Sequence, residues 1–253
     1  MLSHDPHAAG SIDRRLYETM VLLDAGSLER LYRAPPRPAY QRGQRPGLDA
    51  SLRGLLVASE VPVAALVAFT RALGRTVPAD ILGRRFGGTE EAIIARGSDW
   101  GTDVARVACV LAQMGGMAAR LVYLFALGRP YHMHAVIEVH HAGAWGVADP
   151  LTGIVYLGAD GRPLSAAALQ AAPALVVALH DRLGAAAPAK AGGLDAQAHS
   201  ELYGTVCIAE YAISDTQRFS FPVSTSNHYT RTVLDMAQKG WPGGQRWLFG
   251  EDA

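Results

Sequence analysis

The spacing of apolar residues changes at Gly115-Gly116, and this change restricts the fold more than any other feature of the chain. Before it, Val104, Val107 and Leu111 recur at helical intervals, which predicts a helix over residues 102–114 that ends at the glycine pair. After it come three runs rich in Val, Ile, Leu and aromatic residues, as is typical of strands. These runs cover residues 119–127, 131–141 and 144–149. The sequence therefore predicts an α+β fold in which a helix packs on an antiparallel sheet.

Four regions follow from the distribution of proline, glycine and apolar residues. Residues 1–47 form an N-terminal arm, with an expected helix at Ile12 to Ala25, and end in a proline-rich basic connector. Residues 48–183 are the predicted core, whose first part is helical. Residues 184–197, rich in Ala, Pro and Gly, are the expected linker, and residues 198–253 are an expected C-terminal cap packed on the core.

The charge balance and the cysteine content exclude several classes of function. The 23 basic and 23 acidic residues cancel, so no long-range field would draw the chain to nucleic acid or to an anionic membrane. The two cysteines, Cys109 and Cys207, have neither metal-ligand spacing nor the density of a disulfide scaffold. The N-terminus lacks the pattern of a secretory signal, and no apolar run is long enough to span a bilayer. A cytoplasmic protein is therefore expected.

A tight turn predicted at Ala142-Gly143 brings a histidine and an aspartate together. A two-residue or four-residue turn there places His140 opposite Trp145 and makes His134 and Asp149 diagonal neighbours on one face of the hairpin. Such neighbours lie roughly 7–8 Å apart at Cα, within reach of an imidazole–carboxylate hydrogen bond. A three-residue loop would reverse the parity and separate them.

An aspartate that holds one ring nitrogen of a histidine leaves the other nitrogen fixed and basic. This pair is the orienting half of a triad consisting of a nucleophile, a base and an acid. A thiolate nucleophile is expected at a helix N-terminus, where the helix dipole lowers its pKa and free N–H groups form an oxyanion site. In this chain the helix that starts near Thr102 is the natural place, but no cysteine stands there.

The order of these elements resembles the core of transglutaminase-like, papain-related proteins. The resemblance covers roughly a quarter of the chain and is carried by Gly116-Met-Ala-Ala-Arg120, His134-Ala-Val-Ile-Glu138 and Asp149-Pro150, together with Ala105 and Trp145. It implies that His134 is the base and Asp149 its orienting acid. Gly101 stands where that family has its catalytic cysteine, and Val136 stands where a tryptophan is usual.

The resemblance implies a site without covalent thiol chemistry. Cys109 cannot replace the nucleophile, because eight residues along a helix amount to about 12 Å; it is expected to be an inert buried residue. Trp100, Gly101 and Thr102 would form the oxyanion site or pocket, with Thr102 as the expected helix cap. The chain would then be a non-covalent acid/base enzyme acting on a small-molecule or peptide-like substrate without a cofactor. A hydrolase, a lyase or an isomerase would all fit, and such an enzyme could belong to a biosynthetic pathway.

Two alternatives stay open on the sequence alone. The first is a pseudoenzyme whose cleft binds a peptide, an acyl group or a protein partner. The second is a metal site, because His132, His134 and Glu138 share one face of a strand and offer two imidazoles and a carboxylate. In the structural interpretation, Glu138 instead bonds to the backbone or to Arg120.

Overall fold

The chain has an α+β fold with a six-stranded antiparallel sheet. The computed structural model describes residues 20–33, 35–76, 85–126, 133–183, 195–211 and 221–222. In chain order its elements are β1 (Met20–Leu22), α2 (Leu28–Tyr32), α3 (Pro46–Arg53), α4 (Val63–Ala72), the 3₁₀ turn η1 (Leu73–Thr76), β2 (Arg85–Phe86), α5 (Glu90–Arg96), α6 (Gly101–Met114), β3 (Ala119–Phe125), β4 (Met133–His141), β5 (Ala144–Asp149), β6 (Ile154–Val155), α7 (Ala166–Ala171), α8 (Ala174–Leu183), α9 (Ala196–Leu202), β7 (Thr205–Ala209) and β8 (Phe221–Pro222).

The sheet joins segments from the two ends of the described chain. Its strand order is β1-β7-β3-β4-β5-β6, and β2 pairs separately with β8. Strand β7 lies between β1 and β3, with Ala209 paired to Met20 on one side and to Leu121 on the other. The regions predicted as an N-terminal arm and a C-terminal cap therefore each supply a strand to the sheet of the core.

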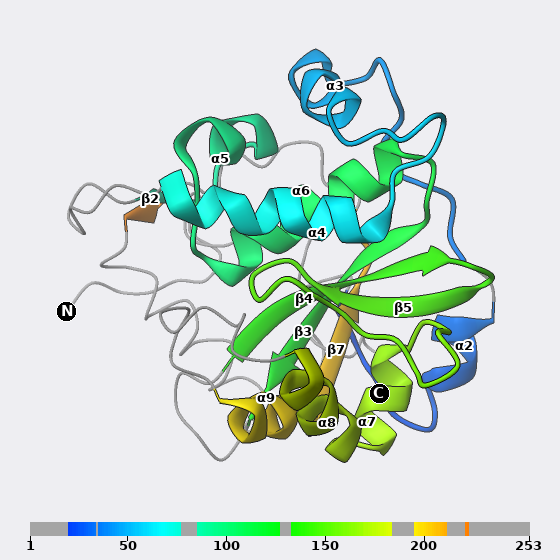
Figure 1. Cartoon of the computed structure of the whole chain (residues 1–253). Coiled ribbons are helices and arrows are strands. Elements are labelled where there is room, and N and C mark those ends of the chain that lie inside the picture. The colour runs from blue at the N-terminus through cyan, green and yellow to red at the C-terminus, as the bar shows by residue number, and fades with distance from the viewer. Residues whose placement is uncertain are drawn as a thin grey trace.

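Helices cover both faces of this sheet (Figure 1). Helix α6 packs on one face, where its apolar residues join those of α4, β3 and β4 in one buried cluster. Helices α7, α8 and α9 cover the other face, which carries a second cluster. Every residue of α6 after Gly101 is buried, including the polar Asp103, Arg106 and Gln113. The helix predicted over 102–114 is therefore confirmed, and it lies at the centre of the fold.

The β4–β5 hairpin has the predicted register. His140 lies opposite Trp145 and Ile137 opposite Ala148. Ala142 and Gly143 both have positive φ, 49° and 77°, as a two-residue turn of the twisted hairpin type requires. The parity on which the predicted histidine–aspartate pairing rests is thus confirmed.

Two local predictions differ from the structure. Of the helix expected at Ile12 to Ala25, residues 12–19 lie outside the described part of the chain. The next three residues form strand β1 and not a helix. Residues 184–194 of the expected linker are also outside the described part, but α9 begins at Ala196, before the predicted linker ends. Asp195 caps α9 through a side-chain bond to the Ala198 N–H, a signal for a helix start.

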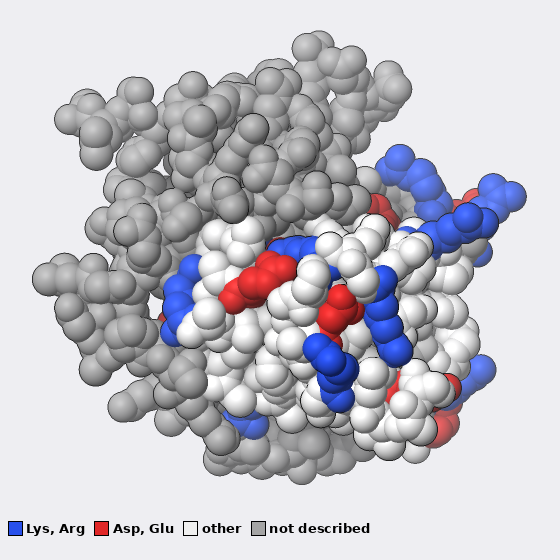
Figure 2. Space-filling model, turned by 90° about the horizontal axis from the view of Figure 1, so that it is seen from above, with Lys and Arg blue, Asp and Glu red and all other residues white. Residues whose placement is uncertain are grey.

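Acidic and basic side chains are intermixed on the face that carries α3 and α5 (Figure 2). Arg45, which precedes α3, forms ion pairs with Glu90 at 2.5 Å and with Glu91, both at the start of α5. This mixture agrees with the balanced charge of the sequence. No helix within the described residues is long and apolar enough to cross a membrane.

Candidate active site

Helix α6 begins at Gly101 without a capping side chain. Trp100, the residue before it, is extended and makes no capping hydrogen bond with its side chain. Thr102, expected to be the cap, is instead the second residue of the helix, because the chain already turns at Gly101. The first N–H groups of a helix have no partner within the helix, so the Gly101 and Thr102 amides are donors of the kind that bind anions.

Asp103 fixes the start of α6 against the segments before it. Its buried carboxylate accepts hydrogen bonds from the Gly87 N–H at 3.0 Å and the Ser98 hydroxyl at 3.0 Å, and pairs with Arg96 at 2.7 Å. Burial raises the pKa of this carboxyl, while Arg106 and Arg96 act in the opposite direction. The first turn of the helix is therefore held in a defined position.

Gly101 faces the His134 ring. A Cβ placed on Gly101 would lie 3.4 Å from His134 Nδ1 and 3.7 Å from the Ala135 backbone nitrogen. These are ordinary contact distances, so a Cβ would fit at this position without a clash. His134 Nδ1 thus points at the residue that the family resemblance assigns to the nucleophile.

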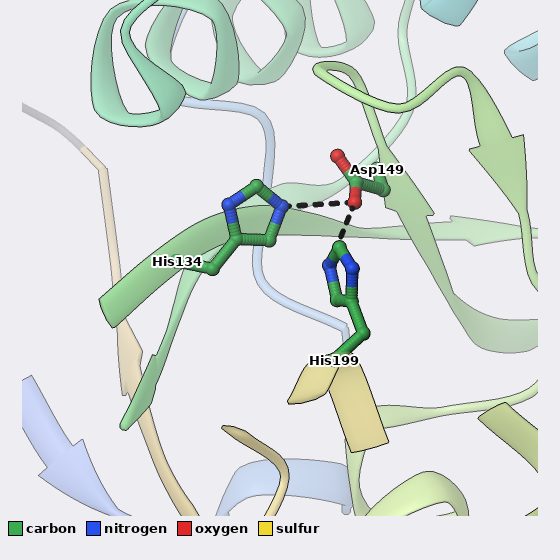
Figure 3. A group of neighbouring side chains, drawn as sticks. All are labelled: His134, Asp149 and His199. Carbon is green, nitrogen blue, oxygen red and sulfur yellow. Dashed lines mark hydrogen bonds and ion pairs between the residues drawn. The ribbon is translucent and has the colours of Figure 1, made fainter. Parts of the chain in front are cut away.

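The other ring nitrogen of His134 binds Asp149, as the hairpin register predicted. Nε2 lies 2.8 Å from Asp149 Oδ2 (Figure 3), and the two residues are 6% and 0% exposed. His134 lies near the start of β4 and Asp149 at the end of β5. The strand pairing therefore brings the two side chains together, and the sheet holds the pair rigidly.

Four contacts stabilise the Asp149 carboxylate. Oδ1 accepts the N–H groups of Leu151 and Thr152 at 2.9 and 3.1 Å, while Oδ2 faces His134 and His199. Burial alone would raise the pKa of this carboxyl, but the neighbouring His134 and His199 outweigh it and hold the pKa well below 3.8. Asp149 is thus an ionised, oriented partner for imidazole.

His199 is a third member of the site that the sequence did not reveal. It lies on α9, with its ring 4.9 Å from the His134 ring, edge to face, and its Nε2 3.4 Å from Asp149 Oδ2. Its side chain is buried, yet neither ring nitrogen has a hydrogen-bond partner, because the contact with Asp149 is poorly aligned. A single histidine in a short helix gives no sequence signal of such a neighbour.

Glu138 is not available to the metal set predicted on β4. Residues four apart on a strand are separated by about 13 Å, so Glu138 lies well away from His134. Its carboxylate instead accepts hydrogen bonds from Arg120 at 2.8 Å, Tyr32 and the Ala166 N–H. The expected structural role of Glu138 is thereby confirmed, and His132, the third predicted ligand, lies outside the described residues.

The remaining predicted residues, Trp100 and the two cysteines, pack in or against the buried core. Trp100 is half-buried and packs against the cluster that contains α6. Cys109 and Cys207 are buried free thiols. Burial raises the pKa of both, to about 12 for Cys207, and the Gln113 amide only partly opposes the effect at Cys109. Neither cysteine is a reactive thiol, as expected for Cys109.

Comparisons with known proteins give no relative. No protein-family model, curated protein or solved structure matches the chain.

Proposed function

We propose that the chain is a non-covalent acid/base enzyme with a transglutaminase-like core from which the nucleophilic thiol is absent. His134 would be the general base, Asp149 the acid that orients it, and the Gly101 and Thr102 amides the donors that bind developing negative charge. The observation that supports this most is the direction of the two ring nitrogens of His134. Nε2 is bound to Asp149 at 2.8 Å, while Nδ1 points at Gly101.

This arrangement suits a substrate that supplies its own reacting group. A water molecule or a polar group of the substrate placed beside Gly101 would lie between a base and the positive end of helix α6. His134 would remove a proton there, and the Asp149 carboxylate would stabilise the resulting imidazolium. The helix amides would bind the developing oxyanion or enolate. Hydrolysis, elimination and isomerisation all use these steps.

Restoring the thiol tests the proposed site. In a Gly101→Cys variant, the new thiol would face His134 Nδ1 and the α6 N-terminus, so iodoacetamide should label it with an apparent pKa below the ordinary value of about 8.5. The two native cysteines are buried and contribute little background.

A second substitution separates the effect of His134 on the thiol pKa from the effect of the α6 N-terminus. Adding His134→Gln to Gly101→Cys should move the apparent thiol pKa upward, whereas adding His140→Gln, on the same strand but at the hairpin end, should leave it unchanged. A thiol pKa that is insensitive to His134→Gln would contradict the assignment of His134 as the base for this position.

The alternative proposal, a binding module without turnover, is favoured by the lack of any nucleophile at position 101. It predicts that wild-type protein hydrolyses p-nitrophenyl acetate no faster than the His134→Gln variant does. The acid/base proposal predicts a His134-dependent rate. The same assay on His140→Gln shows whether any loss is specific to the site.

A further inference from the structure

We propose that His134, Asp149 and His199 form a binding site for a divalent transition-metal ion of the zinc type. This inference goes beyond the proposed acid/base function, because it rests on a different residue, His199, and on a different set of donor atoms. In Figure 3 the two imidazoles approach the same carboxylate from β4 and from α9.

The donor atoms lie close to the spacing of a metal site. One ligand atom from each of the three residues can be chosen so that all three lie within 4.8 Å of one another. Zinc–ligand bonds of about 2.0–2.1 Å at tetrahedral angles place neighbouring donor atoms roughly 3.3 Å apart. The His199–Asp149 distance is already 3.4 Å, and the His134–Asp149 hydrogen bond at 2.8 Å would widen by about half an ångström.

The protein leaves His199 without a hydrogen bond, and this is the independent observation behind the proposal. Its side chain is 2% exposed, and both ring nitrogens are enclosed without a hydrogen-bond partner. An unpaired buried polar group is destabilising, and buried groups of this kind call for an explanation such as an ion. A metal bound beside Asp149 would satisfy His199 Nε2, the ring nitrogen that lies 3.4 Å from the carboxylate.

Backbone hydrogen bonds hold the Asp149 carboxylate in an orientation that suits such an ion. Asp149 Oδ1 is held by the backbone N–H groups of Leu151 and Thr152, so Oδ2, which faces both histidines, is the oxygen that would bind an ion. Ligating carboxylates are commonly fixed by hydrogen bonds of this type. Two imidazoles and one carboxylate match the ligand set of catalytic zinc sites, in which a fourth position is left for water or substrate.

An ion at this position and the base function of His134 exclude each other. The ion would replace the proton shared by His134 Nε2 and Asp149 Oδ2, and the ring would then carry its proton on Nδ1. Bound metal should therefore slow the labelling of a cysteine placed at position 101. The two proposals can fail separately, because metal binding is measured directly and without reference to any reaction.

The test is titration of the full chain, stripped of metal, with ZnCl₂ in a calorimeter at pH 7, and with CoCl₂ in a spectrometer. We expect one bound Zn²⁺ per chain and the intense visible bands of Co²⁺ in a four- or five-coordinate site. His199→Gln should weaken zinc binding by at least about 100-fold, since loss of an outer partner alone costs 10–100-fold. His140→Gln should bind zinc as the wild type does.

Absence of zinc binding and of cobalt bands in the wild-type chain would overturn the proposal, and this result needs no variant to fold. Unchanged zinc binding in a His199→Gln variant whose circular dichroism is native would also overturn the proposal, because the ion would then be held by other histidines.

Discussion

Replacing Gly101 by alanine should stabilise the protein slightly, although the residue touches the site. The added Cβ would lie 3.4 Å from His134 Nδ1 and 3.7 Å from the Ala135 nitrogen, which are contact distances without a clash. Alanine is favoured over glycine by about 1 kcal/mol inside a helix, and by roughly half of that at the first helical residue. For a chain of this size, 0.5 kcal/mol corresponds to a rise in Tm of about 1–2 °C.

Thermal and urea unfolding at pH 7 would measure this difference, with Gly146→Ala as the matched control. A Cβ on Gly146 would lie 2.5 Å from Pro163 Cβ and 3.1 Å from His141 Nε2, so that variant should lose about 2 kcal/mol. A loss of more than about 1 kcal/mol in Gly101→Ala would refute the reasoning, because it would mean that the space in front of His134 is already filled. A gain would mean that the glycine is not needed for stability.

Two further predictions concern the hairpin that carries the site. The folded-state pKa of Asp149 is below its unfolded value of about 3.9, so its ionised form adds stability above that pH, and this contribution is lost as the pH falls below it. Asp149→Asn should therefore be less stable than wild type at pH 7 and lose less stability between pH 5 and 2 in urea titrations; parallel curves would contradict this. Ala142 has a φ of 49°, which asparagine adopts more readily, so Ala142→Asn should raise stability by about 1 kcal/mol in thermal unfolding, and a fall in Tm would show that the turn is built differently.

The sequence could predict the part of the site that local patterning determines. The helical spacing before Gly115 and the turn at Ala142-Gly143 together fix α6, the β4–β5 register and the face shared by His134 and Asp149. Each of these depends on residues close together in the chain. Whether the two side chains share a face depends only on the number of residues in the turn, so the pattern of neighbouring residues is enough to predict it.

Long-range pairing could not be predicted in the same way. Strands β1 and β7 have only three and five residues, and their positions in the sheet depend on partners far along the chain. The place of His199 follows from that of β7, because α9 leads directly into this strand. A shared strand face also does not bring residues four apart close together in space, and Glu138 pairs with Arg120, so this carboxylate is not available to the metal set predicted on β4.

The position of β7 has a consequence for the order of events during synthesis. Until Ala209 has left the ribosome, β3 has no partner on one side, and its exposed edge is open to pairing with other chains. The same delay applies to His199, which arrives beside His134 only with α9. The nascent protein therefore passes through a stage in which the histidine–aspartate pair can form but the third imidazole is absent. Strand β7, the last of the six sheet strands in chain order, thus completes the sheet, and α9 just before it completes the histidine cluster.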